Sequence, residues 1–222
     1  MILNVPNILS KEDAETILET LGQTNSELWI NGAETAFGEA KKVKHNLQCD
    51  TKNPIIRDIL EKARLALLKN TEFMAAARPA KFSRLFINAY EAGMSYGRHL
   101  DAPYIKQLRS DISMTLFLTP PESYEGGNLV LQTPFAEMAF KGPQGSVFIY
   151  PSSYLHEVEQ VTSGTRIAIV GWLKSQIRHP HQREILYDLD KTAGDIGNDK
   201  SQQENFTQLL GIRNRLLREW GD

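Results

Sequence analysis

Apolar residues near the start of the chain repeat with the spacing of an α-helix. The first stripe follows Ser10, a residue type that caps helix N-termini, and the second follows Asn53-Pro54, a pair favoured at a helix start. The two stripes consist of Ala14, Ile17, Leu18 and Leu21, and of Ile56, Ile59, Leu60, Ala63 and Leu67. The pattern predicts two N-terminal helices, separated by a polar stretch at residues 29–50 that is either irregular or a short hairpin.

From about Ala80 the apolar spacing changes to the period of two that is typical of β-strands. Residues 112, 114, 116 and 118, for example, are all apolar. Glycine and proline turns separate the strand candidates, which include residues 82–90, 112–118, 129–132, 137–140, 146–150, 156–161 and 166–173. At least seven short strands with no helix between them predict an antiparallel β-sandwich or barrel.

Helical patterns return towards the end of the chain. We expect a helix at residues 183–190, then a glycine-containing linker at residues 191–200. A last helix is expected to begin with a capping box at Ser201–Glu204 and to present apolar residues up to Trp220. The sequence therefore predicts a small helical appendage over residues 176–222, which either covers an open end of the sandwich or forms a homodimer contact.

Composition limits the classes of protein to consider. The chain has 222 residues and a formal net charge of −2, so it lacks the basic field that attracts nucleic acid or an anionic membrane. Cys49 is the only cysteine, which excludes an intrachain disulfide and a cysteine-rich zinc site. We find no signal-peptide pattern and no apolar run near the ~18 residues of a membrane span, so we expect a cytoplasmic protein.

Candidate chemistry begins at His99-Leu100-Asp101. Side chains two apart on an extended segment point to the same side, so His99 and Asp101 can reach one ion. His156 lies on a later strand candidate and offers a third ligand. Two histidines and one carboxylate on one face of a metal leave the opposite face open. This is the usual arrangement for a mononuclear Fe(II) that binds O2 and an organic co-substrate.

Arg166 offers a binding group for such a co-substrate. It precedes an apolar strand candidate, and an arginine at the start of a buried strand needs an anionic partner. Its planar guanidinium matches a carboxylate in bidentate geometry, so a dicarboxylate would meet this need. We predict a turn at residues 162–165 that places Arg166 on the strand next to His156.

Together these segments resemble the Fe(II)/2-oxoglutarate dioxygenases of the prolyl-hydroxylase-like group, and within them the bacterial PKHD-type hydroxylases. The matching segments are Tyr96–Asp101, Asp111–Leu118, Tyr124–Leu129, Gly145–Val147, His156–Arg166 and Arg183–Asp190. The resemblance implies an α+β, mainly β fold. Its first domain, residues 1–175, would hold a double-stranded β-helix (jelly roll) core supported by N-terminal helices, and residues 176–222 would form the helical extension.

The resemblance also implies which residues act. His99, Asp101 and His156 would bind Fe(II), Arg166 would bind the distal carboxylate of 2-oxoglutarate, and Tyr90 would assist it. The implied reaction hydroxylates an aliphatic carbon and releases succinate and CO2, with ascorbate as a further cofactor. The substrate would be either a protein prolyl or other side chain, or a small molecule linked to iron and siderophore metabolism.

Several alternatives stay open at this point. A cupin-like metalloprotein without oxidative chemistry would use the same three ligands but would not need Arg166, and a silent interaction module would need neither. Trp29 either lines the substrate mouth or packs, and His179 with His181 marks the surface or a helix start. We expect substrate specificity to come from loops at residues 29–50 and 102–110.

Overall fold

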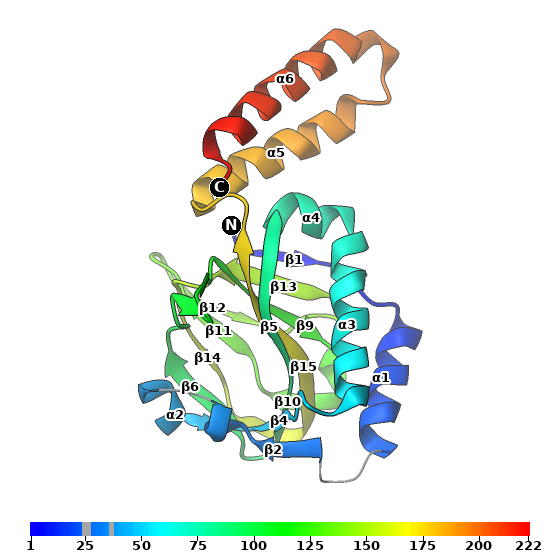
Figure 1. Ribbon diagram of the computed structural model, residues 1–222. Helices are drawn as coiled ribbons and strands as arrows, with labels where there is room; N and C mark the ends of the chain where they lie inside the picture. Colours follow the sequence, from blue (N-terminus) through cyan, green and yellow to red (C-terminus); the bar gives the residue numbers. More distant parts are fainter. Residues whose placement is uncertain (24–27, 36–37) are drawn as a thin grey trace.

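The computed structural model describes residues 1–23, 28–35 and 38–222 of the protein. Figure 1 shows β-sheets with two helices, α1 and α3, along one side, and a helical hairpin that projects from one end. Every strand pair within the described residues is antiparallel. This confirms the antiparallel arrangement that the period of two predicted.

The larger sheet has eight strands and the smaller has five. The larger follows the order β1-β13-β9-β15-β5-β4-β2, with β10 paired to β15, and the smaller follows β12-β11-β14-β6-β3. The strands of the larger sheet are β1 (Leu3–Val5), β2 (Trp29–Asn31), β4 (Leu47–Cys49), β5 (Pro79–Glu91), β9 (Ile112–Phe117), β10 (Tyr124–Gly126), β13 (Val147–Pro151) and β15 (Val161–Ser175). Those of the smaller sheet are β3 (Lys44–His45), β6 (Ser95–His99), β11 (Leu129–Gln132), β12 (Glu137–Phe140) and β14 (Leu155–Val158). A separate hairpin pairs β7 (Tyr104–Ile105) with β8 (Leu108–Arg109).

The helices are α1 (Lys11–Gln23), α2 (Glu39–Lys42), α3 (Pro54–Lys69), α4 (Thr71–Ala77), α5 (Pro180–Ile196) and α6 (Gln203–Trp220). Both predicted N-terminal helices are confirmed, with their caps. The backbone N–H of Asp13 donates to Ser10 Oγ at 3.0 Å, and that of Ile55 donates to Asn53 Oδ1 at 2.9 Å. Helix α4 was not predicted, because its run of seven residues is too short to show a helical period.

Strand alternation divides the buried residues into two cores. One core joins the helices to the larger sheet and includes Ile56, Leu67, Leu116 and Ile169. The other lies between the sheets and is rich in aromatic residues; its buried members are Tyr90, Phe117, Leu129, Leu131, Phe148, Tyr150, Val158 and Val161. Each fully buried large apolar side chain stabilises the fold by about 1.5–3 kcal/mol. The larger sheet therefore lies between two apolar layers, and the face that it turns towards the smaller sheet can also carry a few polar groups.

One corrected strand boundary matters for function. The predicted turn at residues 162–165 is wrong, since β14 ends at Val158 and β15 already begins at Val161. Gly164 lies within β15 opposite Tyr124 of β10, with φ at +72°. A Cβ built on it would lie 2.3 Å from the Ser123 carbonyl oxygen, so the glycine serves close pairing with β10 rather than a turn.

The C-terminal segment also differs from the prediction. Most of the predicted linker at 191–200 is helical, because α5 continues to Ile196 and buries Ala193. The predicted capping box at Ser201–Glu204 is wrong. Instead Asp199 Oδ1 accepts a hydrogen bond from the Ser201 N–H at 2.8 Å, and a short 3-10 turn precedes α6.

The helical hairpin is anchored to the sandwich at its base. Helix α5 contacts α4, and Asp190 of α5 pairs with Arg78 at the end of α4. The backbone N–H of Asp222 donates to the Gln176 carbonyl at 2.9 Å, so the end of α6 returns to the point where the hairpin leaves β15 (Figure 1). No helix among the described residues is long and apolar enough to cross a membrane.

Candidate active site

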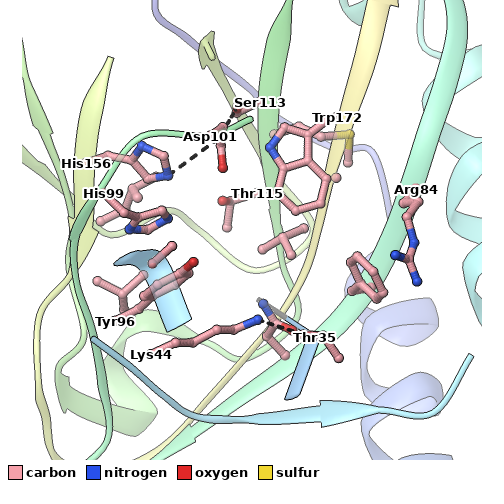
Figure 2. A pocket seen from close by; sticks show the side chains of 18 of the residues that line it. Thr35, Lys44, Arg84, Tyr96, His99, Asp101, Ser113, Thr115, His156 and Trp172 are labelled. Atoms are coloured by element: carbon pink, nitrogen blue, oxygen red, sulfur yellow. Dashed lines mark hydrogen bonds and ion pairs between the residues drawn. The ribbon is translucent and has the colours of Figure 1, made fainter. Parts of the chain in front are cut away.

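A cavity of about 250 Å³ lies between the two sheets. Its walls come from β5, β9 and β15 of the larger sheet and from β6 and β14 of the smaller one. Residues of the 29–50 and 102–110 segments complete its edge, at the positions where we expected substrate specificity to be set. In Figure 2 the two histidines lie on one side, Arg84 lies opposite them, and Trp172 stands between.

His99, Asp101 and His156 meet at this cavity. One ligand atom from each lies within 4.8 Å of the other two, and His156 Nε2 is 3.6 Å from Asp101 Oδ2. Register explains the meeting, because His99 of β6 is the direct partner of His156 of β14. The next-but-one residue after His99 then brings the carboxylate to the same side. The three residues that sequence spacing singled out are therefore one cluster.

The hydrogen bonds of both histidine rings favour metal binding. His99 Nδ1 lies 2.8 Å from the Gly97 carbonyl oxygen and His156 Nδ1 lies 2.9 Å from that of Tyr154. A carbonyl can only accept, so each Nδ1 carries a proton, and in the neutral ring Nε2 is then the atom with a lone pair for a metal. Burial, and secondly the charge of His156, lower the pKa of His99 to about 4, which keeps it neutral at pH 7. This donor set fits Fe(II).

A hydroxyl chain orients the carboxylate. Ser113 Oγ donates to Asp101 Oδ2 at 2.5 Å, and the Ser113 hydroxyl also lies 2.8 Å from that of Ser152. Behind the first histidine, the Tyr96 ring stacks on the His99 ring with centroids 3.6 Å apart. Such supporting contacts fix the orientation of metal ligands before an ion arrives.

Arg166 lies deep in the same cavity, with 1% of its surface exposed. Its Nε and Nη1 atoms have no hydrogen-bond partner within the described residues. The guanidinium carbon lies 5.3 Å from the Tyr90 ring centroid and 5.5 Å from that of Phe117. Aromatic faces compensate a buried cation only in part, by about 0.5–2 kcal/mol, so this guanidinium is set up for an anion.

The structure places Arg166 differently from the prediction. It does not lie on the strand next to His156, because β14 and β15 belong to different sheets. Arg166 faces the cavity from the larger sheet, and its register partner is Tyr90 of β5. A ligand that contacts both Arg166 and the two histidines must therefore span the gap between the sheets.

Several residues of the cavity were missed by sequence reasoning, among them the polar residues Lys44, Gln48, Ser113 and Thr115 and the aromatic Trp172. Ser113 and Thr115 had a signal, because they are the polar members of a strand whose other face is apolar. We assigned no role to that polar face, and it is buried. Lys44 and Gln48 had no signal, since they come from two very short strands in a polar stretch.

The structure shows the positions of Trp29 and of the His179 and His181 pair, for which the sequence left two roles open. Trp29 of β2 packs against the helix-side core and is not among the cavity-lining residues that the structure describes. His179 is the residue before α5 and is exposed, as is His181, with the ring centroids 5.7 Å apart. Trp29 is thus a packing residue and the histidine pair marks a helix start.

Comparison with known proteins identifies the family. Residues 85–174 match the 2OG-Fe(II) oxygenase superfamily, and residues 181–222 match the PKHD-type hydroxylase C-terminal domain. A PKHD-type hydroxylase of Crocosphaera subtropica is 39% identical over 100% of both chains, and PKHD-type hydroxylase YbiX of Shigella dysenteriae is 35% identical, again over 100% of both. The chain belongs to the PKHD-type hydroxylases. This PKHD-type hydroxylase is therefore a 2-oxoglutarate-dependent oxygenase, which agrees with its His-Asp-His cluster.

Solved structures support the fold of this PKHD-type hydroxylase. It is similar to a prolyl-4-hydroxylase of Pseudomonas putida, with a TM-score of 0.54, 18% identity, and coverage of 78% of this chain and 92% of the other. It is also similar to a prolyl hydroxylase of Trichoplax adhaerens, with a TM-score of 0.56, 17% identity and coverage of 83% and 86%. These likenesses confirm the predicted α+β, mainly β fold class.

Proposed function

We propose that the enzyme binds Fe(II) through His99, Asp101 and His156, binds 2-oxoglutarate through Arg166, and hydroxylates an aliphatic carbon. The observation that carries this proposal is the shared cavity: it holds a three-ligand cluster and a buried guanidinium whose Nε and Nη1 atoms have no hydrogen-bond partner within the described residues. A cupin-like enzyme without oxidative chemistry would have no use for that guanidinium.

When bound, iron and 2-oxoglutarate would supply, together with O2, the chemistry that inserts one oxygen atom into a C–H bond and places the other in succinate, with release of CO2. The protein positions the metal ligands and the co-substrate. Ser113 keeps the Asp101 carboxylate turned to the histidines, and the two backbone carbonyls hold each ring through its Nδ1 atom, which leaves Nε2 to face the metal. Arg166 holds the far carboxylate of the co-substrate at a fixed depth, assisted by Tyr90. The aromatic core around them excludes water.

For the substrate we propose a prolyl or other side chain of a peptide or protein. The Trichoplax enzyme of similar fold is in complex with a peptide fragment of hypoxia inducible factor, which shows that this fold can bind a peptide segment. A small molecule linked to iron and siderophore metabolism is the rival. We propose in addition that ascorbate supports turnover, as a reductant for the iron, and that the enzyme acts in the cytoplasm.

Succinate formation tests the reaction. Purified protein with Fe(II) and 2-oxoglutarate should release succinate slowly without any substrate, and faster with a matching peptide or metabolite from a panel. Omission of ascorbate should shorten the period of activity. The proposal fails if no succinate forms and if 2-oxoglutarate does not tighten Fe(II) binding.

We further propose that residues 1–175 form the catalytic unit and that α5 and α6 mediate a homodimer. Within the described residues α6 buries none of its side chains, although it exposes Ile212, and α5 exposes Ile185. Light scattering on the full chain should give twice the monomer mass, and the double variant Ile185→Glu, Ile212→Glu should give the monomer mass with succinate formation intact. A monomeric wild-type protein would contradict the dimer alone.

A further inference from the structure

Lys44 reaches the active-site cavity from β3, at the edge of the smaller sheet. Its Nζ atom lies 3.1 Å from Thr35 Oγ1 and 3.2 Å from Gln48 Oε1. It also lies 5.4 Å from the centroid of the Tyr96 ring, which stacks on His99 (Figure 2). The ammonium group is therefore separated from the first histidine of the cluster by a single aromatic ring.

The hydrogen-bond partners of Lys44, the Thr35 hydroxyl and the Gln48 amide, are neutral. Within the described part of the chain, no carboxylate lies at ion-pair distance from its Nζ, and Asp101 acts on it only at longer range. Burial lowers the pKa of Lys44 to about 8, so the group is still mostly protonated at pH 7. A cation that loses hydration without gaining an anion is costly, which is the situation that a charged ligand would relieve.

Gln48 places a second donor beside this ammonium. An ammonium cannot accept a hydrogen bond, so Gln48 turns its Oε1 atom to Lys44 and to the Thr35 hydroxyl, at 2.6 Å. The Nε2 atom of the same amide is left buried without a partner, in a residue that is 1% exposed. An amide donor without an acceptor costs about 1–3 kcal/mol when buried. An ammonium whose hydrogen-bond acceptors are neutral and an amide donor without an acceptor thus lie side by side among the residues that line the cavity.

The net charge of the cavity also favours an anionic ligand. Among the described lining residues Lys44, Arg84 and Arg166 are cationic and Asp101 is the only carboxylate. Arg84 stacks over the Phe86 ring, with its guanidinium carbon 4.4 Å from the ring centroid. The two charges of Fe(II) and the two of 2-oxoglutarate cancel. With both of them bound, the cavity therefore keeps an excess of positive charge at Lys44 and Arg84.

We propose that Lys44, with Gln48 beside it, binds a carboxylate of the primary substrate, which is therefore an aliphatic carboxylic acid, either free or as the end of a peptide chain. This rests on the proposed function, because it assigns Arg166 to 2-oxoglutarate. An ammonium and an amide match the single charge and two oxygens of a carboxylate. The carbon to be hydroxylated then lies between Lys44 and the His-Asp-His cluster.

Protection of Lys44 from acylation tests the proposal without turnover. The protein is loaded with Fe(II) and 2-oxoglutarate without O2 and treated with an amine-reactive reagent, and Lys44 modification is followed by peptide mass spectrometry. Hexanoate should slow the acylation of Lys44 in a saturable manner, and hexanamide should not. Lys41 of α2, which is exposed, should react at the same rate in every sample. Equal protection by acid and amide would overturn the proposal, as would full protection by 2-oxoglutarate alone.

Calorimetry with hexanoate provides a second measurement. The Lys44→Met variant should bind it at least about tenfold more weakly, while Lys44→Arg should retain most of the affinity and the control Lys41→Met should match the wild type. An unchanged hexanoate affinity in Lys44→Met, or weakened 2-oxoglutarate binding in its place, would be incompatible with the assignment. If Lys44→Met does not fold, the wild-type acylation result stands as the test.

Experiments can distinguish a free acid from the end of a peptide chain as the source of the carboxylate. They can also distinguish a failure of the carboxylate site from a failure of the proposed reaction. Gly-Gly-Leu and its amide, used in the acylation experiment, distinguish a peptide chain end from a free acid, since only a peptide site would favour the tripeptide acid over hexanoate. A protein that binds acids at Lys44 but never forms succinate would refute the proposed reaction alone. A protein that forms succinate without acid-specific protection would refute only the carboxylate site.

Discussion

The two cationic ends of the cavity are built in different ways. Arg166 lies on β15, which pairs along its length with β5 and β9 in the middle of the larger sheet, and aromatic rings surround it. Lys44 lies on a strand of two residues at the edge of the smaller sheet, held by neutral side chains. The central position of Arg166 fixes how deep in the cavity a co-substrate binds. The edge position of Lys44 allows the substrate-binding site to change in shape without disturbing the core.

The metal cluster lines the same cavity as these two ends, and the loss of one of its ligands gives the largest expected effect. Asp101→Ala removes one of three ligands, so we expect succinate formation to fall to the background of metal-free protein. Lys44 should still be protected by hexanoate, because its partners are unchanged. Asp58→Ala, an exposed position on α3, is the control and should keep full activity. Full 2-oxoglutarate-dependent activity of Asp101→Ala would refute the metal assignment.

Arg166→Met separates the two ends of the cavity. The variant should raise the KM for 2-oxoglutarate about 100-fold, equivalent to ~2.7 kcal/mol, because a buried charged contact to the co-substrate is lost. The unfolding temperature of the ligand-free protein should stay equal or rise, since a buried guanidinium with unpartnered nitrogens is removed. Arg84→Met, which removes the other arginine of the cavity, should leave this KM unchanged. A similar KM increase in both variants would show that the two ends are not distinct.

The difference between the two ends also explains what the sequence could predict. His99, His156 and Arg166 were predictable because regular strands carry them, and Asp101 because it follows the end of β6 by two residues, so that strand geometry turns sequence spacing into spatial position. The assignment of neighbours was less reliable: a glycine used for close strand pairing at Gly164 has the same sequence signal as a turn. The clustering of His99, Asp101 and His156 was predicted, but Arg166 was expected on the strand next to His156 and lies on the other sheet.

The Lys44 end was not predictable for a physical reason. Its residues have no apolar period, because β3 and β4 together contain only five residues and most of their contacts come from distant parts of the chain. The C-terminal hairpin shows the opposite case. Its helical period was found, but glycines at 194 and 197 predicted an early end to α5 that burial of Ala193 overrides.

Ser113→Ala should produce a smaller effect, confined to the metal. The hydroxyl donates to Asp101 Oδ2, so its loss should weaken Fe(II) binding by roughly tenfold while the KM for 2-oxoglutarate changes little at saturating iron. Ser153→Ala, at an exposed neighbouring position, is the matched control. Titration of Fe(II) against both variants checks this. Unaltered iron affinity in Ser113→Ala would mean that the carboxylate is oriented by something other than this hydroxyl.

Tyr90→Phe tests the finest distinction at the Arg166 end, namely whether Tyr90 acts through its hydroxyl or through its ring. The guanidinium carbon lies 5.3 Å from the ring centroid, and burial raises the pKa of the hydroxyl, so Tyr90 stays a neutral donor at any working pH. If the hydroxyl assists the co-substrate carboxylate, its loss removes one net hydrogen bond and raises the KM for 2-oxoglutarate roughly three- to fivefold. Tyr90→Leu removes the ring as well and serves as the comparison. Equal KM values for wild type and Tyr90→Phe, with an increase only in Tyr90→Leu, would assign the contribution to the aromatic face, and Arg166 alone would then hold the carboxylate.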